Sequence, residues 1–99
     1  SDRKYTPGVY TSSFTLGNED LEVEVSVSDT SINSIRISNL SETVTAMYPL
    51  LQPSLENLAD QICKSQSLDH LTLSSDSPYT SQLLLNTIRD ALKKAAATN

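Results

Sequence analysis

The sequence predicts an α+β domain, in which an antiparallel sheet built in strand-strand-strand-helix-strand-helix order carries two helices packed on one face. Three observations lead to this prediction. Apolar and polar residues alternate strictly over Leu21–Val27, as in a strand with one buried face. Turn-forming residues separate this segment from neighbours that also alternate. Two later segments repeat apolar residues every three or four positions, the spacing of helices that bury one stripe.

The chain has 99 residues, of which 37% are hydrophobic. This length and this content support one domain with a modest core, and no repeat or linker divides the chain. We expect residues 8–97 to form that domain. Residues 1–7 are expected to form an extended segment leading into it, with Pro7-Gly8 as its last, turn-forming pair.

The first predicted strand is Gly8–Leu16. Its apolar residues on one face are Tyr10, Phe14 and Leu16, with Thr and Ser residues between them. Gly17-Asn18 predicts a turn, because both residues tolerate positive φ. Leu21–Val27 follows as the second strand and shows the clearest alternation of the chain.

A turn at Ser28–Thr30 leads to the third predicted strand, Ile32–Leu40, in which Ile35 and Ile37 point inward. Arg36 then lies on the opposite face, where it can pair with a glutamate of the neighbouring strand. An exposed pair of this kind is worth well under about 1 kcal/mol. Short turns between three consecutive strands indicate an antiparallel meander.

The first predicted helix begins at Pro53-Ser54, with Ser54 as its N-cap, after an apolar stretch over residues 46–51. Its apolar stripe consists of Leu55, Leu58, Ala59, Ile62 and Cys63. Cys63 belongs to this stripe, so we interpret it as a packed core thiol and not as a nucleophile.

A short fourth strand is predicted over His70–Leu73, with Leu71 and Leu73 inward and His70 outward. The last helix then starts near Ser77-Pro78, with serine as the N-cap and proline at the first helical position that it prefers. Its predicted core stripe is Leu84, Leu85, Ile88, Ala91, Leu92 and Ala95.

The net charge of −5, from 7 basic and 12 acidic residues, argues against nucleic acid as a partner. A single cysteine rules out an internal disulfide, and one histidine with one cysteine does not indicate a metal cluster. No apolar stretch is long enough to span a membrane. The sequence starts at Ser1 without a methionine, from which we expect that a leader or membrane anchor was removed.

Several segments together resemble the small FMN-binding domain of flavin-carrying subunits of membrane redox complexes and of bacterial fumarate-reductase-like proteins. The resemblance covers residues 7–96. Its segments are Pro7-Gly8-Val9-Tyr10-Thr11, the two strands over 23–37, Ile62-Cys63-Lys64-Ser65-Gln66-Ser67 and the final helix from Thr80 to Leu92. Their order and spacing carry the resemblance.

This resemblance implies a cofactor site at Ser75, Asp76, Ser77, Pro78, Thr80 and Ser81. The family carries Ser-Gly-Ala-Thr ahead of the last helix, and its threonine contacts the flavin phosphate or bears it covalently. Aligned on Thr80-Ser81, the four positions are Ser75, Asp76, Ser77 and Pro78. Pro78 has no hydroxyl, which excludes covalent flavin attachment there, while Ser77 and Thr80 offer hydroxyls in a shifted register.

Asp76 also opposes a flavin phosphate on physical grounds. A helix N-terminus suits a phosphate because of its unpaired N–H groups and positive dipole end. Asp76 places a carboxylate there, and two like charges about 4 Å apart cost roughly 4 kcal/mol at an effective dielectric constant near 20. The rings that could stack on a flavin are Tyr10, Phe14, Tyr48 and Tyr79, which we interpret as core or rim residues.

Three functions follow as hypotheses. The first is a domain of FMN-binding-like fold that has lost covalent flavin and serves as a binding module for a protein or small molecule. The second is non-covalent FMN binding with electron transfer, using Ser75, Ser77, Thr80 and Ser81 around the phosphate. The third is a hydrolase with His70 as base, although no nucleophile elbow or acid partner accompanies it. The resemblance implies a bacterial, extracytoplasmic and membrane-anchored setting.

Overall fold

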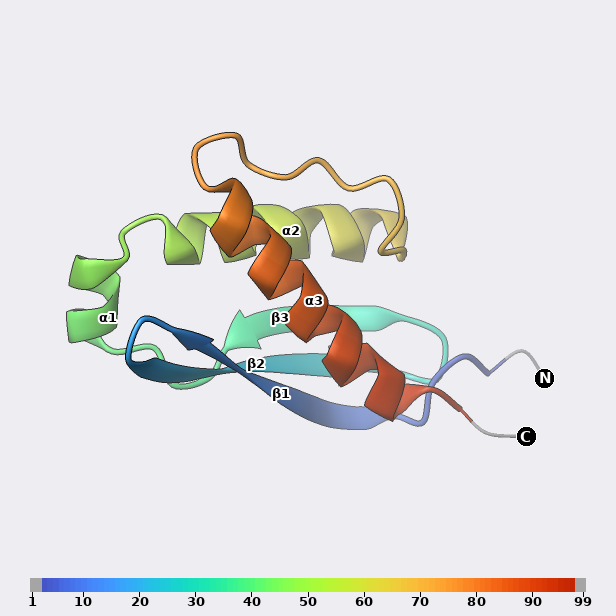
Figure 1. The fold of residues 1–99 in the computed structure, drawn as a ribbon. Coiled ribbons are helices and arrows are strands. Elements are labelled where there is room, and N and C mark those ends of the chain that lie inside the picture. Colours follow the sequence, from blue (N-terminus) through green and yellow to red (C-terminus); the bar gives the residue numbers. More distant parts are fainter. Residues whose placement is uncertain (1–2, 98–99) are drawn as a thin grey trace.

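The computed structural model describes residues 3–97, so Ser1 and Asp2 of the expected leading segment lie outside the described residues, as do residues 98–99. A three-stranded antiparallel sheet is covered on one face by two long helices, and a short helix lies at one end (Figure 1). The predicted α+β class is confirmed. Within residues 3–97 no helix is both long and apolar enough to cross a bilayer.

The sheet has the order β1-β2-β3, with β1 at Gly8–Leu16, β2 at Glu19–Val27 and β3 at Ile32–Ile37. The turn between β1 and β2 contains Gly17 in the left-handed region, at φ 61°, as its residue type predicts. Apolar residues of β2 at alternate positions are all buried, so the helices cover the face that the alternation predicted.

β3 ends at Ile37 and not at Leu40, because the next residues bond across to β2 in an irregular way. The Ser38 N–H donates to the Glu22 carbonyl (2.9 Å), and the Asn39 side chain accepts from the Glu22 N–H (2.9 Å). The expected cross-strand pair is confirmed, since Arg36 Nε lies 3.2 Å from a Glu24 carboxylate oxygen on the open face.

Three helices follow the sheet: α1 at Glu42–Met47, α2 at Leu51–Ser65 and α3 at Pro78–Ala95. The prediction that Ser54 caps α2 is wrong, because α2 begins three residues earlier, after Leu50. The Ser54 N–H donates to the Leu50 carbonyl (3.0 Å), which places Ser54 inside the first turns. Pro53 does not prevent this start, since proline is tolerated in the first turn, where N–H groups lack helical partners.

The predicted fourth strand over His70–Leu73 is also wrong. This segment is irregular, and Figure 1 shows it passing over α2 on the side away from the sheet. The Thr72 backbone bonds to a side chain instead of a strand: its N–H donates to Gln61 Oε1 (2.9 Å) and its carbonyl accepts from Gln61 Nε2 (2.8 Å). Leu71 and Leu73 are half-buried and His70 is exposed, so the alternation predicted burial correctly but not pairing.

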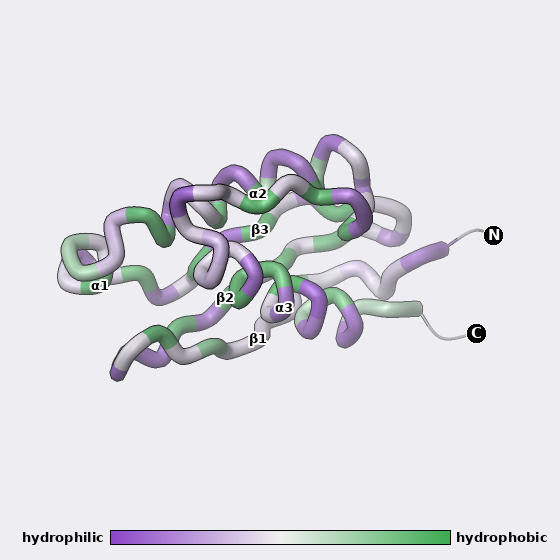
Figure 2. The backbone as a smooth tube through the Cα atoms, turned by 45° about the horizontal axis from the view of Figure 1, so that its top comes forward, coloured by the Kyte–Doolittle hydropathy of each residue, from purple (hydrophilic) through white to green (hydrophobic). Residues whose placement is uncertain are grey.

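The core lies between the sheet and the α2–α3 layer, and apolar segments alternate with hydrophilic ones along these elements (Figure 2). The predicted α3 stripe is buried in full: Leu84, Leu85, Ile88, Ala91, Leu92 and Ala95. In α2, Leu55, Leu58 and Ile62 are buried, while Ala59 and Cys63 are half-buried and pack against the core.

Candidate binding groove

Ser77 and Pro78 begin α3 as predicted, with Ser77 at the N-cap and Pro78 at the first helical position. The Ser81 N–H donates to the Ser77 carbonyl (2.9 Å). The Ser77 hydroxyl does not cap the helix, because it is paired with the Ser54 hydroxyl of α2 at 2.6 Å. The two helices are thereby joined at the start of α3.

This pairing leaves backbone donors free at the start of α3. Pro78 has no N–H, and within residues 3–97 no hydrogen bond is formed by the N–H of Tyr79 or of Thr80. Both donors belong to the positive end of an 18-residue helix. The start of α3 therefore keeps hydrogen-bonding capacity that an N-cap side chain would ordinarily use.

Two surface hollows meet at this point. The first, of about 450 Å³, lies between the start of α2 and residues 72–77. The second, of about 410 Å³, lies between residues 47–51 and residues 76–80. Both are lined by Leu50, Asp76 and Ser77, so the two hollows adjoin, and we call them together the α1–α3 groove.

Five of the six residues predicted to form a cofactor site line this groove. Ser75 lines the first hollow, Pro78 and Thr80 line the second, and Asp76 and Ser77 line both. Ser81 does not line either hollow. It is 1% exposed, and its hydroxyl has no hydrogen-bond partner within residues 3–97.

The four aromatic candidates separate into two pairs. Phe14 is buried in the core, and the half-buried Tyr10 donates its hydroxyl to the Thr6 carbonyl (2.8 Å). Tyr48 and Tyr79 line the second hollow, and Tyr79 is 72% exposed. The interpretation as core or rim residues describes Tyr10, Phe14 and the half-buried Tyr48, which packs against the core, whereas Tyr79 is exposed beside the groove.

Sequence reasoning missed the opposite wall of the groove, which is formed by Met47, Pro49 and Leu50. Met47 is 55% exposed and Leu50 is 46% exposed, which is high for large apolar side chains. The available signal was the apolar stretch over residues 46–51, which is too short and too irregular to bury itself in one helix. α1 and α2 meet in this stretch, and their junction leaves Met47 and Leu50 at the surface while Leu51 is buried.

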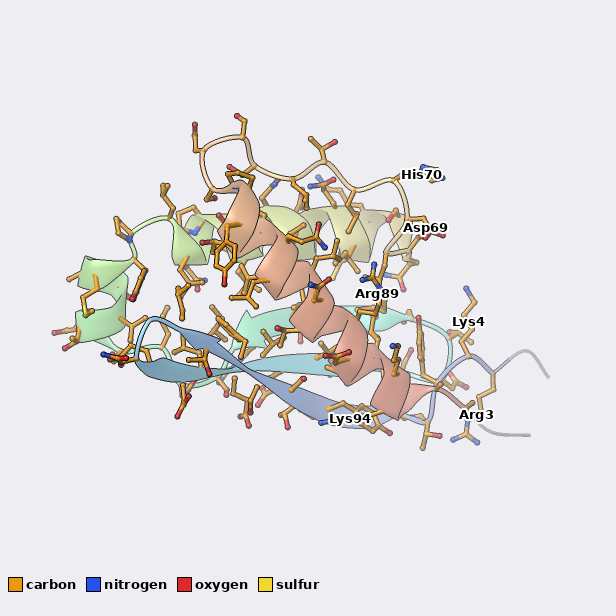
Figure 3. The ribbon with its side chains drawn as sticks, in the orientation of Figure 1. Arg3, Lys4, Asp69, His70, Arg89 and Lys94 are labelled. Atoms are coloured by element: carbon orange, nitrogen blue, oxygen red, sulfur yellow. The ribbon has the colours of Figure 1, made fainter. Side chains whose placement is uncertain are left out.

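Asp76 is the one charged side chain among the residues that line the two hollows. No Lys, Arg or His lines them. Figure 3 shows Arg3, Lys4, Arg89 and Lys94 in the other half of the molecule, toward the end of α3. The lining residues therefore do not fit a dianionic flavin phosphate, because a carboxylate stands where a cation or an uncharged residue is needed.

His70, the base in the hydrolase hypothesis, lies outside the α1–α3 groove. A third hollow of about 440 Å³ is lined by His70, Asp69 and Lys64, but His70 forms no hydrogen bond or ion pair within residues 3–97 (Figure 3). Burial raises the pKa of the Cys63 thiol, and the Asp60 carboxylate raises it further, which disfavours the nucleophilic thiolate. Among residues 3–97 no three His, Cys, Asp or Glu side chains gather as metal ligands.

Comparison with known proteins adds no family assignment, since no protein-family model and no curated protein matches the chain.

Proposed function

We propose that this chain is an interaction module of FMN-binding-like fold that carries no covalent flavin and uses the α1–α3 groove to bind a partner. One observation carries the proposal: the exposed apolar side chains Met47, Leu50 and Tyr79 gather around a groove whose single charge is Asp76. Exposed apolar side chains that cluster, unlike scattered ones, are typical of interaction sites.

The chemistry of the groove favours an apolar partner segment that is uncharged or cationic. Burying a large apolar side chain is worth roughly 1.5–3 kcal/mol, so a segment covering this wall gains binding free energy. Tyr79 offers a ring for apolar or cation–π contact, and Asp76 adjoins it as a partner for Lys or Arg. An anionic segment would instead meet the Asp76 carboxylate.

We also propose an extracytoplasmic, membrane-tethered setting, which rests on the family resemblance. The Ala97 N–H donates to the Lys4 carbonyl (3.0 Å), so the two ends of the described chain lie together. Figure 1 shows α1 at the other end of the molecule and the start of α3 in the half of the molecule away from the termini. A tether before residue 4 would therefore leave the groove facing away from the membrane.

A displayed library of random peptides tests the interaction module. We expect enriched peptides to combine apolar residues with Lys or Arg, and to lose binding at least about tenfold with Tyr79→Ser or Leu50→Ser. Val9→Ser is the control, because the exposure of Val9 (58%) lies between those of Leu50 (46%) and Tyr79 (72%) and Val9 lies on β1, outside the groove. Enrichment that does not depend on Tyr79 or Leu50 would contradict the proposal.

Non-covalent FMN binding is the second candidate, and the unpaired N–H groups of Tyr79 and Thr80 favour it. Visible absorption after addition of FMN and desalting tests it. We expect no retained flavin in the wild-type protein. The triple variant Asp76→Gly, Ser77→Ala, Pro78→Thr rebuilds the family motif and is expected to retain more. Flavin colour retained by the wild-type chain would make electron transfer the leading function.

A further inference from the structure

The outer edge of β1 carries an unpaired row of backbone groups. β1 pairs with β2 on one side only, and the sheet order leaves its other side without a strand. The row can be identified from two bonds. The Glu22 carbonyl bonds toward β3 through the Ser38 N–H, so Ser13, which lies opposite Glu22, directs its own N–H and carbonyl away from β2.

The second bond identifies the same row two residues earlier. The Lys94 ammonium donates to the Thr11 carbonyl, which therefore also points away from β2. By alternation, the outward row consists of Val9, Thr11, Ser13 and Thr15. Within residues 3–97, Lys94 is the one group that bonds to this row.

The two edges of the sheet differ in their protection. At β3, the Gln66 side chain accepts from the Ile32 N–H (2.6 Å) and donates to the Ile32 carbonyl (3.0 Å), as a neighbouring strand would. β3 also carries Arg36. β1 is nine residues long and contains no charged residue and no proline. A long, uncharged edge of this kind is a template for pairing with another strand.

We propose that β1 pairs with β1 of a second copy of this chain, in antiparallel register about a two-fold axis, to form a continuous six-stranded sheet. Full overlap places Thr11 of one copy opposite Ser13 of the other, so the outward groups of both exchange hydrogen bonds. The absence of charge along β1 favours this occupant, because two copies of net charge −5 meet there without charged side chains opposing one another on the paired strands.

Lys94 blocks the outward row of β1 at one position, the Thr11 carbonyl. Its ammonium must leave the Thr11 carbonyl before a second strand can pair. Asp90 lies one turn earlier in α3, at the (i, i+4) spacing that places it on the same helix face, and offers an acceptor of complementary charge. In a two-fold pair, the Lys94 of each copy can bond to an Asp90 carboxylate instead of the carbonyl.

Sedimentation equilibrium from micromolar to millimolar concentration tests the pairing. We expect the wild-type protein to form dimers as concentration rises. Lys94→Met is expected to strengthen association about tenfold, because the edge no longer has to release a charged hydrogen bond. Ser13→Pro is expected to weaken it at least about tenfold by removing an outward N–H, with Ser13→Ala as the control that keeps this N–H.

Amide hydrogen exchange supplies a readout that needs no variant. Dimerisation is expected to slow exchange at Val9, Thr11, Ser13 and Thr15 as concentration rises, and to leave Tyr10 and Ser12, already paired with β2, unchanged. The proposal is overturned if the wild-type and Lys94→Met proteins both stay monomeric. It is also overturned if dimers form without added protection of these four amides.

Discussion

The hydroxyls of Ser54 and Ser77 form one hydrogen bond, but removing one hydroxyl is expected to lower the free energy of unfolding by a different amount from removing the other. Ser54 is 4% exposed, whereas Ser77 is half-buried. Ser77→Ala leaves the Ser54 hydroxyl buried without a partner, at about 1–3 kcal/mol of unfolding free energy, while Ser54→Ala leaves a hydroxyl that water can reach, at about 1 kcal/mol or less. Denaturant titration of both single variants and the double variant measures this. Equal costs for the two single changes would contradict the assignment.

Cys63 is a second residue whose chemistry depends on its surroundings. Burial raises the pKa of its thiol, and Asp60 raises that pKa further, so the folded state holds the thiol proton more tightly than the unfolded state does. The stability from this difference is present below the ordinary thiol pKa and is lost as pH rises through the raised pKa. We expect the pH midpoint of iodoacetamide alkylation to lie above the ordinary value and to fall with Asp60→Asn. A wild-type midpoint at or below the ordinary value would contradict this.

At the scale of elements, Gln66 joins α2 to β3. It ends α2 in the left-handed region at φ 58°, and its amide bonds to both backbone groups of Ile32 and to the Cys63 carbonyl (2.7 Å). Gln66→Ala removes all three bonds and is expected to lower the free energy of unfolding by about 1–3 kcal/mol. Gln82→Ala, on the exposed face of α3, is the matched control with an expected change within about 0.5 kcal/mol. Thermal unfolding of both variants checks the contrast.

The helices and strands also show which sequence patterns predict structure correctly. Strict alternation in β2 and the stripe of α3 predicted their burial correctly, because each reflects the period of its own backbone. The predicted strand over His70–Leu73 has the alternation of a strand but pairs with no other strand among the described residues, and its Thr72 backbone bonds to the Gln61 side chain instead. The sequence placed the start of α2 too late because serine is a typical N-cap residue. The Ser54 hydroxyl instead bonds to the hydroxyl of Ser77, at the start of α3.

At the scale of the whole molecule, the side chain of Tyr48, at the end of α1, lies against Gly17 in the turn between β1 and β2. A Cβ atom on Gly17 would collide with the Tyr48 hydroxyl, and Gly17 has φ 61°. Gly17→Ala is therefore expected to destabilise the fold by more than the roughly 1–2 kcal/mol of a left-handed conformation alone. Adding Tyr48→Phe should recover the part due to the collision. Chemical denaturation of both variants measures this, and no recovery in the double variant would contradict the contact.

Local pattern in the sequence determined the α+β class, the three strands, the apolar stripes of the long helices and the place where α3 begins, because backbone period and capping preference act over a few residues. Tertiary structure alone decided that residues 47–51 meet residues 72–80 to form the α1–α3 groove. It also decided that Ser77 pairs with Ser54, that Gln66 bonds to Ile32 of β3 and that Lys94 bonds to Thr11 of β1. These contacts join residues 23 to 83 positions apart, and no local period records such distances.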